Sequence, residues 1–212
     1  MRYYILCGGY YMKDRSELPK QLREYGTGIT LVERTVNFLR LNGVDDILIV
    51  ADDDRFERIG LPIFKREYPE GKKHWLDGLT FADRPATYIF GDVFFSPKAI
   101  QTIVETKTDD IEFFASAPPF SPEYFKSWAE PFAFKVESPL KFIRCVNTCI
   151  ELADQGAFKR DPIAWELWQV IKKTPLNVID YTNYTVINDY TTDFDNEVEF
   201  QEFTKRMKGV KE

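Results

Sequence analysis

Tyr3-Tyr4-Ile5-Leu6-Cys7-Gly8-Gly9 begins the most informative stretch of this chain, which continues through a polar loop to Leu18-Pro19-Lys20-Gln21. The apolar residues of this first run predict a buried strand. The glycine pair lets backbone N–H groups approach phosphate oxygens closely, and cationic side chains in the loop add positive charge. A strand, a glycine turn and a basic loop predict nucleotide binding, and a solvated surface loop with paired charges is the alternative. The loop cations are Lys13, Arg15, Lys20 and Arg23.

Strand and helix patterns alternate along the first half of the chain. Thr30-Leu31-Val32-Glu33 has the spacing of a capping box, and the helix it begins should end near Asn42-Gly43. Continuous apolar runs at 47–51 and 87–90 predict strands that are covered on both faces. Ser96-Pro97 predicts another helix start, with serine as the N-cap and proline in the first turn. This alternation predicts an open α/β sheet.

The second half is less regular, and its elements are predicted from shorter patterns. We expect strands at 111–115, 132–136, 178–181 and 184–187, and helices at 140–154, 162–172 and 194–207. No linker, repeat or low-complexity tract interrupts the sequence, so we expect a single domain over residues 1–212.

Composition and charge exclude several classes of protein. The 212 residues carry a net charge of −6 and a sequence pI of about 5.1, whereas general nucleic-acid binders have a basic excess. Without a signal-length or membrane-spanning apolar run, we expect a cytoplasmic protein that neither inserts into a membrane nor binds nucleic acid. The three cysteines lack CxxC spacing and predict reduced thiols. His74 is the single histidine, which leaves little for structural zinc or Ser/His catalysis.

Two acidic residues that follow predicted strands are candidate metal ligands. Asp92 comes after a glycine at the carboxyl end of the strand at 87–90, where open α/β sheets bind ligands; capping of the next turn is the alternative. Mg²⁺ prefers hard oxygen donors and takes one or two protein carboxylates together with phosphate oxygens. Asp189 follows the strand at 184–187 and is the candidate second ligand. Asp193 is assigned to capping the last helix, where the helix dipole stabilises an acid.

Together these residues resemble the nucleotidyltransferase family with the GT-A-type fold, which includes sugar-phosphate nucleotidylyltransferases and cytidylyltransferases. The glycine loop with Pro19-Lys20 matches the family's opening signature, and 26–36 is similar to its G-x-P-L-x-E-R-T-V segment. Gly91-Asp92-Val93 resembles the metal-binding Gly-Asp, and 187–193 resembles the closing D-T-x-x-D. The resemblance spans nearly the whole chain. It implies a three-layer αβα domain with a Rossmann-like, mostly parallel mixed sheet.

The resemblance also implies an activity and its residues. A Mg²⁺-dependent enzyme of this family transfers a nucleoside monophosphate from a triphosphate to a phosphorylated acceptor and releases pyrophosphate, for cell-surface polysaccharide or related precursors. Lys20 and Asp92 would be catalytic, and Asp92 and Asp189 would bind the metal. A nucleotide-binding half at 1–110 would precede an acceptor-binding half at 111–190 and a C-terminal helix at 191–212. The nucleotide-binding residues would be Leu6, Cys7, Gly8, Gly9, Tyr11, Lys13 and Lys20.

Two loop positions differ from the family pattern and keep other functions open. Tyr11 stands where the family has a second glycine, and Lys13 replaces an arginine and loses bidentate contact with phosphate. A GT-A glycosyltransferase that uses a nucleotide sugar is one alternative, with Asp52 and Asp54, or Asp92, holding its metal. A non-catalytic protein that binds nucleotide or sugar phosphate is another.

The acceptor is less specified than the reaction. A sugar phosphate is expected, a choline-type phosphate stays open, and the Pro-Lys-Gln sequence favours a pyrimidine nucleotide. Trp165 lies off the apolar stripe of its helix and could line a pocket or an interface, and it could form a cation cage with the aromatic loop 120–128. Packing in the core or at an interface is the alternative for this tryptophan. A homodimer also stays open.

Overall fold

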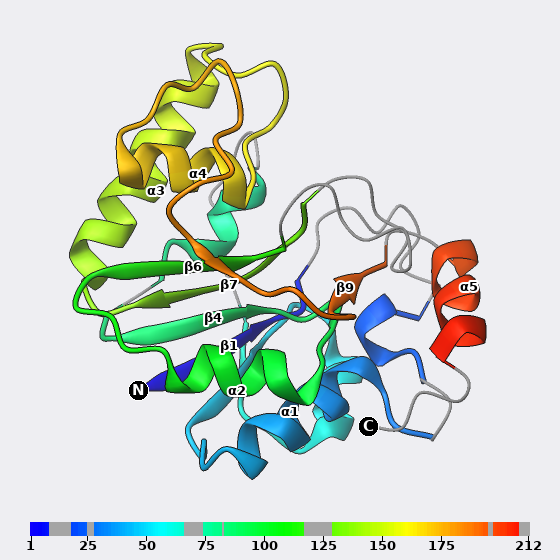
Figure 1. Cartoon of the computed structure of the whole chain (residues 1–212). Helices are drawn as coiled ribbons and strands as arrows, with labels where there is room; N and C mark the ends of the chain where they lie inside the picture. Colours follow the sequence, from blue (N-terminus) through cyan, green and yellow to red (C-terminus); the bar gives the residue numbers. More distant parts are fainter. Residues whose placement is uncertain are drawn as a thin grey trace.

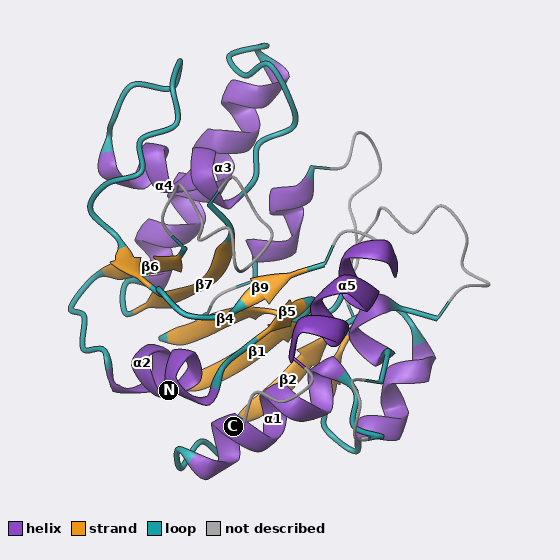
Figure 2. Ribbon diagram, turned by 45° about the vertical axis from the view of Figure 1, so that its right-hand side comes forward, coloured by secondary structure: helices purple, strands orange, loops and turns teal. Residues whose placement is uncertain are grey.

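The computed structural model describes residues 1–8, 18–24, 28–65, 74–81, 83–116, 129–194 and 197–207. A seven-stranded sheet lies at its centre, with helices on both faces (Figure 1). One face is covered by α1 (Leu31–Leu41) and α2 (Pro97–Glu105). The other is covered by α3 (Pro139–Asp154) and α4 (Ala164–Lys172), as a second view also shows (Figure 2). The predicted three-layer αβα arrangement is confirmed.

The strands of the main sheet follow the order β3-β2-β1-β4-β7-β6-β8, and β7 runs antiparallel to both of its neighbours. The other pairings in this sheet are parallel, so the expected mostly parallel mixed sheet is confirmed. In chain order the strands are β1 (Arg2–Leu6), β2 (Ile47–Val50), β3 (Ile63–Phe64), β4 (Ala86–Phe90), β6 (Ile111–Ala115), β7 (Pro131–Val136) and β8 (Thr185–Val186).

Shorter elements complete the described chain. β5 (Val93–Phe94) and β9 (Thr192–Asp193) form a separate antiparallel ribbon, which we call the β5–β9 ribbon. The last helix, α5 (Glu197–Met207), lies at the edge of the molecule beyond β9 (Figure 1). Three short 3₁₀ helices also occur: η1 (Lys20–Leu22), η2 (Asp54–Ile59) and η3 (Trp75–Leu79).

The ends of α1 follow from its local sequence. The backbone N–H of Glu33 donates to the Thr30 hydroxyl at 3.2 Å, and the backbone N–H of Thr30 donates to the Glu33 carboxylate at 2.8 Å. This is the predicted capping box. The helix ends at Leu41, and Gly43 takes a φ of 77°, the left-handed conformation that glycine adopts without strain.

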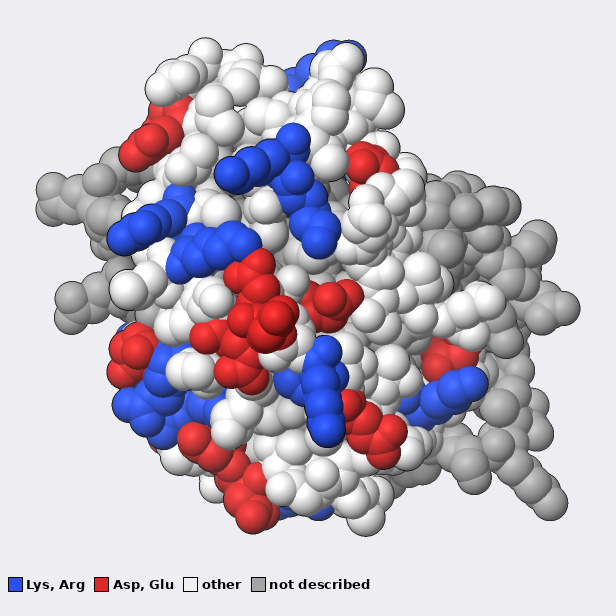
Figure 3. All heavy atoms as spheres, turned by 60° about the vertical axis from the view of Figure 1, so that its left-hand side comes forward, with Lys and Arg blue, Asp and Glu red and all other residues white. Residues whose placement is uncertain are grey.

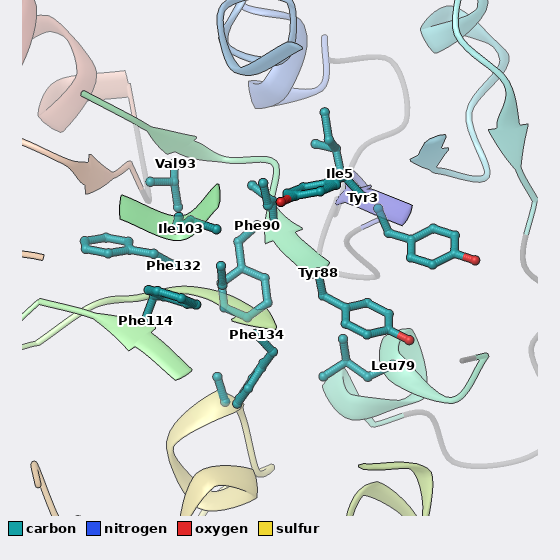
Figure 4. Close-up of a cluster of buried hydrophobic side chains, with 14 of the residues drawn as sticks. Tyr3, Ile5, Leu79, Tyr88, Phe90, Val93, Ile103, Phe114, Phe132 and Phe134 are labelled. Atoms are coloured by element: carbon teal, nitrogen blue, oxygen red, sulfur yellow. The ribbon is translucent and has the colours of Figure 1, made fainter. Parts of the chain in front are cut away.

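Aromatic side chains make up much of the core, and Figure 4 shows Tyr88, Phe90 and Phe134 among them. The rings of Phe113 and Phe134 stack with centroids 4.6 Å apart, and Phe134 also contacts Phe90 and Phe142. Because adjacent strands place these rings on one face, they pack across β4, β7 and β6 and against α3. Aromatic pairs of this kind contribute stability beyond their buried area, which helps to hold the short strands in register.

Two predictions for the second half were wrong. The segment 178–181 is not a strand: Val178 is 70% exposed, and its carbonyl accepts a hydrogen bond from Gln169 Nε2 at 2.6 Å, so the segment packs against α4. The last helix begins at Glu197 rather than at Phe194. Phe194 is buried instead against Phe94, with ring centroids 6.5 Å apart.

His74 lies in the interior, between two carboxylates from a distant part of the chain. Its Nδ1 is 2.6 Å from Asp161 Oδ1, and its Nε2 is 3.2 Å from Asp154 Oδ1. The second oxygen of Asp161 accepts a hydrogen bond from the Trp75 backbone at 2.8 Å. His74 therefore joins η3 to the end of α3 and to the segment before α4.

We expect Asp161→Asn to lower the free energy of unfolding by about 1–3 kcal/mol, because asparagine offers one acceptor oxygen to two donors. Asp154→Asn should cost less than about 1 kcal/mol, because the Asp154 side chain is 57% exposed and makes one contact with the imidazole. Urea denaturation of the two variants measures the difference. Equal losses would show that the Trp75 and His74 contacts of Asp161 do not carry this stability.

Candidate functional site

The candidate site lies where β1 and β4 end side by side. The two strands are parallel, and Leu6 is in register with Phe90. The backbone N–H of Gly91 donates to the carbonyl of Leu6 at 3.0 Å. Cys7 and Gly8 therefore leave β1 at the sheet edge where Asp92 leaves β4.

Gly91 is required by the close approach of these two strand ends. A Cβ at this position would lie 2.6 Å from Cys7 Sγ and 2.8 Å from the Leu6 carbonyl oxygen. The Cys7 side chain is buried against this turn, and burial together with the nearby Asp92 charge raises the pKa of its thiol well above the usual range. Cys7 is therefore a protonated residue that packs in the core. Its side chain leaves room for glycine at position 91 but not for a residue with a Cβ.

Lys20 reaches the site from η1. The η1 segment is held against the start of α1 by the buried Leu22, and the Leu31 N–H donates to the Arg23 carbonyl at 3.2 Å. The Lys20 ammonium lies 2.7 Å from Asp92 Oδ2 and donates to the Phe194 carbonyl at 3.0 Å. The structure thus brings together the two residues that the sequence predicted to be catalytic.

The β5–β9 ribbon brings another acidic residue opposite the strand that follows Asp92. Asp193 is in register with Val93, the residue directly after Asp92. The prediction that Asp193 caps the last helix was wrong, because α5 begins four residues later and Asp193 belongs to β9. Opposed residues of an antiparallel pair have Cα atoms about 5 Å apart, so Asp193 is a functional candidate that the sequence interpretation missed.

Asp189 lies in a different place from the one expected. Its Oδ2 accepts a hydrogen bond from the Ser96 hydroxyl at 2.6 Å, and its Oδ1 accepts one from the Thr191 backbone at 2.8 Å. Ser96 is the N-cap of α2 and follows Asp92 by four residues, which span about 13 Å when extended. The structure therefore brings Asp189 to the start of α2.

The other predicted site residues either lie outside the described residues or belong to the core. Gly9, Tyr11 and Lys13 lie outside the described residues, as does the aromatic loop 120–128. Trp165 is 4% exposed and packs against core rings, including Phe113 at 5.0 Å, so it is a core residue rather than a pocket lining.

The acidic run after β2 is engaged locally. Asp53 caps η2 and pairs with Arg55, and Asp54 lies 2.6 Å from the Lys65 ammonium. These ion pairs fit a solvated turn better than a metal site, which weakens the glycosyltransferase alternative based on Asp52 and Asp54.

The donors at this edge suit a hard divalent cation. Asp92 already contacts a cation, the Lys20 ammonium, and Asp193 adds a second carboxylate on the adjacent strand. A site that held the metal with protein ligands alone would need a group of three or more metal-ligating side chains. The described part of the chain contains no such group. Mg²⁺ commonly takes one or two carboxylates and completes its coordination with phosphate oxygens and water. The residues present therefore fit Mg²⁺ bound together with a phosphate ligand.

The surface carries charges of both signs. On the face that Figure 3 shows, lysine and arginine side chains lie next to aspartate and glutamate side chains rather than in a separate patch. None of the described helices has the length and apolar character needed to cross a membrane.

Comparisons with known proteins identify the fold. No family model and no curated protein sequence matches the chain. Solved structures do match over nearly its whole length. The inositol-1-phosphate CTP transferase from T. maritima is 16% identical with a TM-score of 0.55, and the match covers 99% of this chain and 97% of that one. A putative glucose-1-phosphate thymidylyltransferase from Bacillus anthracis is 16% identical with a TM-score of 0.57, covering 100% and 96%.

A third structure extends the comparison. The CTP:phosphocholine cytidylyltransferase from Streptococcus pneumoniae is 16% identical with a TM-score of 0.52, and the match covers 96% of this chain and 97% of that one. The chain therefore has the α/β fold of nucleotidyltransferases, as its motifs predicted.

Proposed function

We propose, from this fold and from the Lys20–Asp92 pair at its ligand-binding edge, that the protein is a nucleotidylyltransferase. It would join a nucleoside monophosphate from a nucleoside triphosphate to a phosphorylated small molecule, with release of pyrophosphate. The observation that carries the proposal is the 2.7 Å contact between a lysine from the glycine-loop segment and an aspartate at the end of β4. Ligands of open α/β sheets bind beyond these strand ends.

The chemistry requires charge and positioning rather than a protein nucleophile. An oxygen of the acceptor phosphate forms a bond to the α-phosphorus, and the bond from the α-phosphorus to the bridging oxygen breaks. Pyrophosphate leaves with that electron pair. Lys20 would leave Asp92 and the Phe194 carbonyl to contact the α-phosphate, where its ammonium offsets the charge that develops there. Backbone N–H groups of the loop from Gly8 would bind the remaining phosphates, together with Lys13.

Asp92 would be one magnesium ligand in the proposed site, and Asp193 is the second carboxylate favoured by the β5–β9 pairing. When bound there, Mg²⁺ supplies positive charge to the phosphate oxygens. The carboxylates hold it at the sheet edge, and their own orientation depends on the turn at Gly91 and on the ribbon.

The substrate proposal follows the sequence and the similar proteins. The three structures named above act, by their names, with CTP or as a thymidylyltransferase, whereas the similar HddC from Yersinia pseudotuberculosis was solved with GMP-PN. The proposal of a pyrimidine nucleotide therefore follows the Pro-Lys-Gln sequence. Two of the names specify a cyclitol or sugar phosphate and one specifies phosphocholine. We therefore propose a sugar or cyclitol phosphate as the acceptor, in the synthesis of a nucleotide-activated precursor by a cytoplasmic enzyme.

Pyrophosphate release with CTP, UTP, ATP and GTP tests the proposal when each is combined with glucose 1-phosphate, inositol 1-phosphate or phosphocholine and Mg²⁺. We expect release that requires both substrates and is fastest with a pyrimidine triphosphate. Its absence in every combination would contradict the proposal. Sugar transfer from a nucleotide sugar would favour the glycosyltransferase alternative, and thermal stabilisation by ligands without turnover would favour a binding protein.

A further inference from the structure

The β5–β9 ribbon contains Asp193 and directly follows Asp92, but it is very short. Each strand contributes two residues to the pairing, Val93 and Phe94 on one side and Thr192 and Asp193 on the other. An isolated two-stranded ribbon is only marginally stable in water, so other contacts must determine how β9 lies on β5. The position of Asp193 relative to Asp92 depends on those contacts.

A hydrogen-bond network joins the two chains just beyond the ribbon. The Ser96 hydroxyl donates to Asp189 Oδ2 at 2.6 Å, and the Ser96 backbone N–H donates to the Thr191 hydroxyl at 3.0 Å. The Thr191 backbone N–H donates to Asp189 Oδ1 at 2.8 Å. Ser96 and Thr191 are 2% and 0% exposed, so water competes little for these bonds. The same Ser96 hydroxyl accepts from the Ala99 backbone and caps α2.

We propose that this Ser96–Asp189–Thr191 network positions the catalytic site by setting the register of β9 on β5. The proposal rests on the proposed function, and it deepens it by assigning Asp189 to positioning rather than to metal binding. Because side chains alternate along a strand, a slip of one residue would move Asp193 to the opposite face of the ribbon. The network opposes that slip by joining α2, which follows β5, to the residues that precede β9.

At the other end of the ribbon Phe194 packs against Phe94, but the polar contacts change during the proposed reaction. There, the Lys20 ammonium forms an ion pair with Asp92 and donates a hydrogen bond to the carbonyl of Phe194, the residue after β9. In the proposed reaction Lys20 transfers to the nucleotide phosphate, and its bonds to the ribbon are then lost. The Ser96–Asp189–Thr191 network contains no residue with a proposed ligand contact, so it persists when the site is filled.

Asp189→Asn separates positioning from metal binding. Asparagine keeps an oxygen to accept from Thr191 N–H and gains an amino group that donates to the Ser96 hydroxyl, but it loses the charge that a Mg²⁺ ligand supplies. Asp189→Ala removes both contacts. Ser96→Ala removes the hydroxyl, and Ser96→Thr retains it. The double variant with alanine at 96 and 189 tests whether the two residues act as one unit.

Mn²⁺ binding, measured by electron paramagnetic resonance with a non-hydrolysable CTP analogue, is the readout, with thermal unfolding recorded for every variant. We expect Asp189→Ala and Ser96→Ala to weaken Mn²⁺ binding about 10-fold, since residues that orient metal ligands commonly have effects of this size. Asp189→Asn and Ser96→Thr should remain within about 2-fold of the wild type. The double variant should be no weaker than the worse single variant. Asp161→Asn serves as the control, because it should lower the stability of the protein at the His74 contacts, away from the ribbon. It should bind Mn²⁺ like the wild type.

Three results would overturn the inference. If Asp189→Asn abolishes Mn²⁺ binding as Asp92→Asn does, Asp189 is a direct ligand. If Asp189→Ala and Ser96→Ala both bind like the wild type, the network does not position the site. If the wild type binds no Mn²⁺ with a non-hydrolysable analogue of CTP, UTP, ATP or GTP, the proposed function itself fails, and the inference fails with it. The last result is recognised because it appears in the wild type.

Discussion

Lys20→Ala and Asp92→Asn should each lower the rate of pyrophosphate release by about 10²–10³-fold, the usual effect of removing one preorganised charged group from an active site. The first variant removes the ammonium that offsets charge at the α-phosphate. The second removes a carboxylate charge from the proposed metal ligands. Both residues are about one-third exposed, so neither change should prevent folding. Steady-state kinetics under saturating nucleotide and acceptor give the rates.

The Lys141–Asp110 ion pair supplies a matched control. It is a lysine–aspartate contact like that of Lys20, but it joins the first turn of α3 to the residue before β6. Lys141→Ala and Asp110→Asn should leave the rate within about 2-fold of the wild type, because exposed pairs contribute little. If Lys20→Ala and Asp92→Asn turn over as fast as these controls, the proposed site is wrong.

Gly91→Ala should lower the free energy of unfolding by about 1–3 kcal/mol, the usual cost of adding a methyl group to a filled space. The new Cβ would lie 2.6 Å from Cys7 Sγ and 2.8 Å from the Leu6 carbonyl oxygen, both closer than van der Waals contact. The strand ends must separate, and Asp92 moves with them. We therefore also expect a loss of pyrophosphate release of at least about 10-fold. Urea denaturation and kinetics measure the two effects.

A double variant tests that explanation. Combining Gly91→Ala with Cys7→Ala removes the closer contact and leaves the one with the Leu6 backbone. It should recover part of the lost stability relative to Gly91→Ala, even though Cys7→Ala alone destabilises the core. No recovery would show that the Leu6 contact alone limits the turn. Wild-type stability in the single variant would contradict the required close approach.

Elements whose signals are local were predicted well. The α1 capping box depends on Thr30 and Glu33 alone, and its hydrogen bonds form as the spacing indicates. The strands at 47–51 and 87–90 were recognised because runs buried on both faces are continuously apolar. The segment 178–181 also contains apolar residues. Its Val178 carbonyl accepts a hydrogen bond from Gln169, and the segment pairs with none of the described strands. Val178 and Tyr181 are exposed, so apolar composition there indicated neither a strand nor a buried segment.

The β5–β9 ribbon could not be predicted from periodicity. Strands of two residues carry no measurable alternation, and their pairing joins residues about a hundred positions apart. The sequence interpretation consequently assigned Asp193 to the following helix and Asp189 to the metal. The observed register and the Ser96 hydrogen bond favour the opposite assignment.

The sequence by itself determined the fold class and the strands that end at Leu6 and Phe90, and it singled out Asp92 at the end of the second of them. These follow from short-range patterns and from the rule that parallel strands end together. The tertiary structure alone decided which acid of the final segment pairs with the strand that follows Asp92. That choice depends on the register of β9, which is set by hydrogen bonds between residues as far apart as Ser96 and Asp189, 93 positions along the chain. Local sequence does not encode such a distance, because the bonds form only when the sheet, α2 and the final segment have packed together.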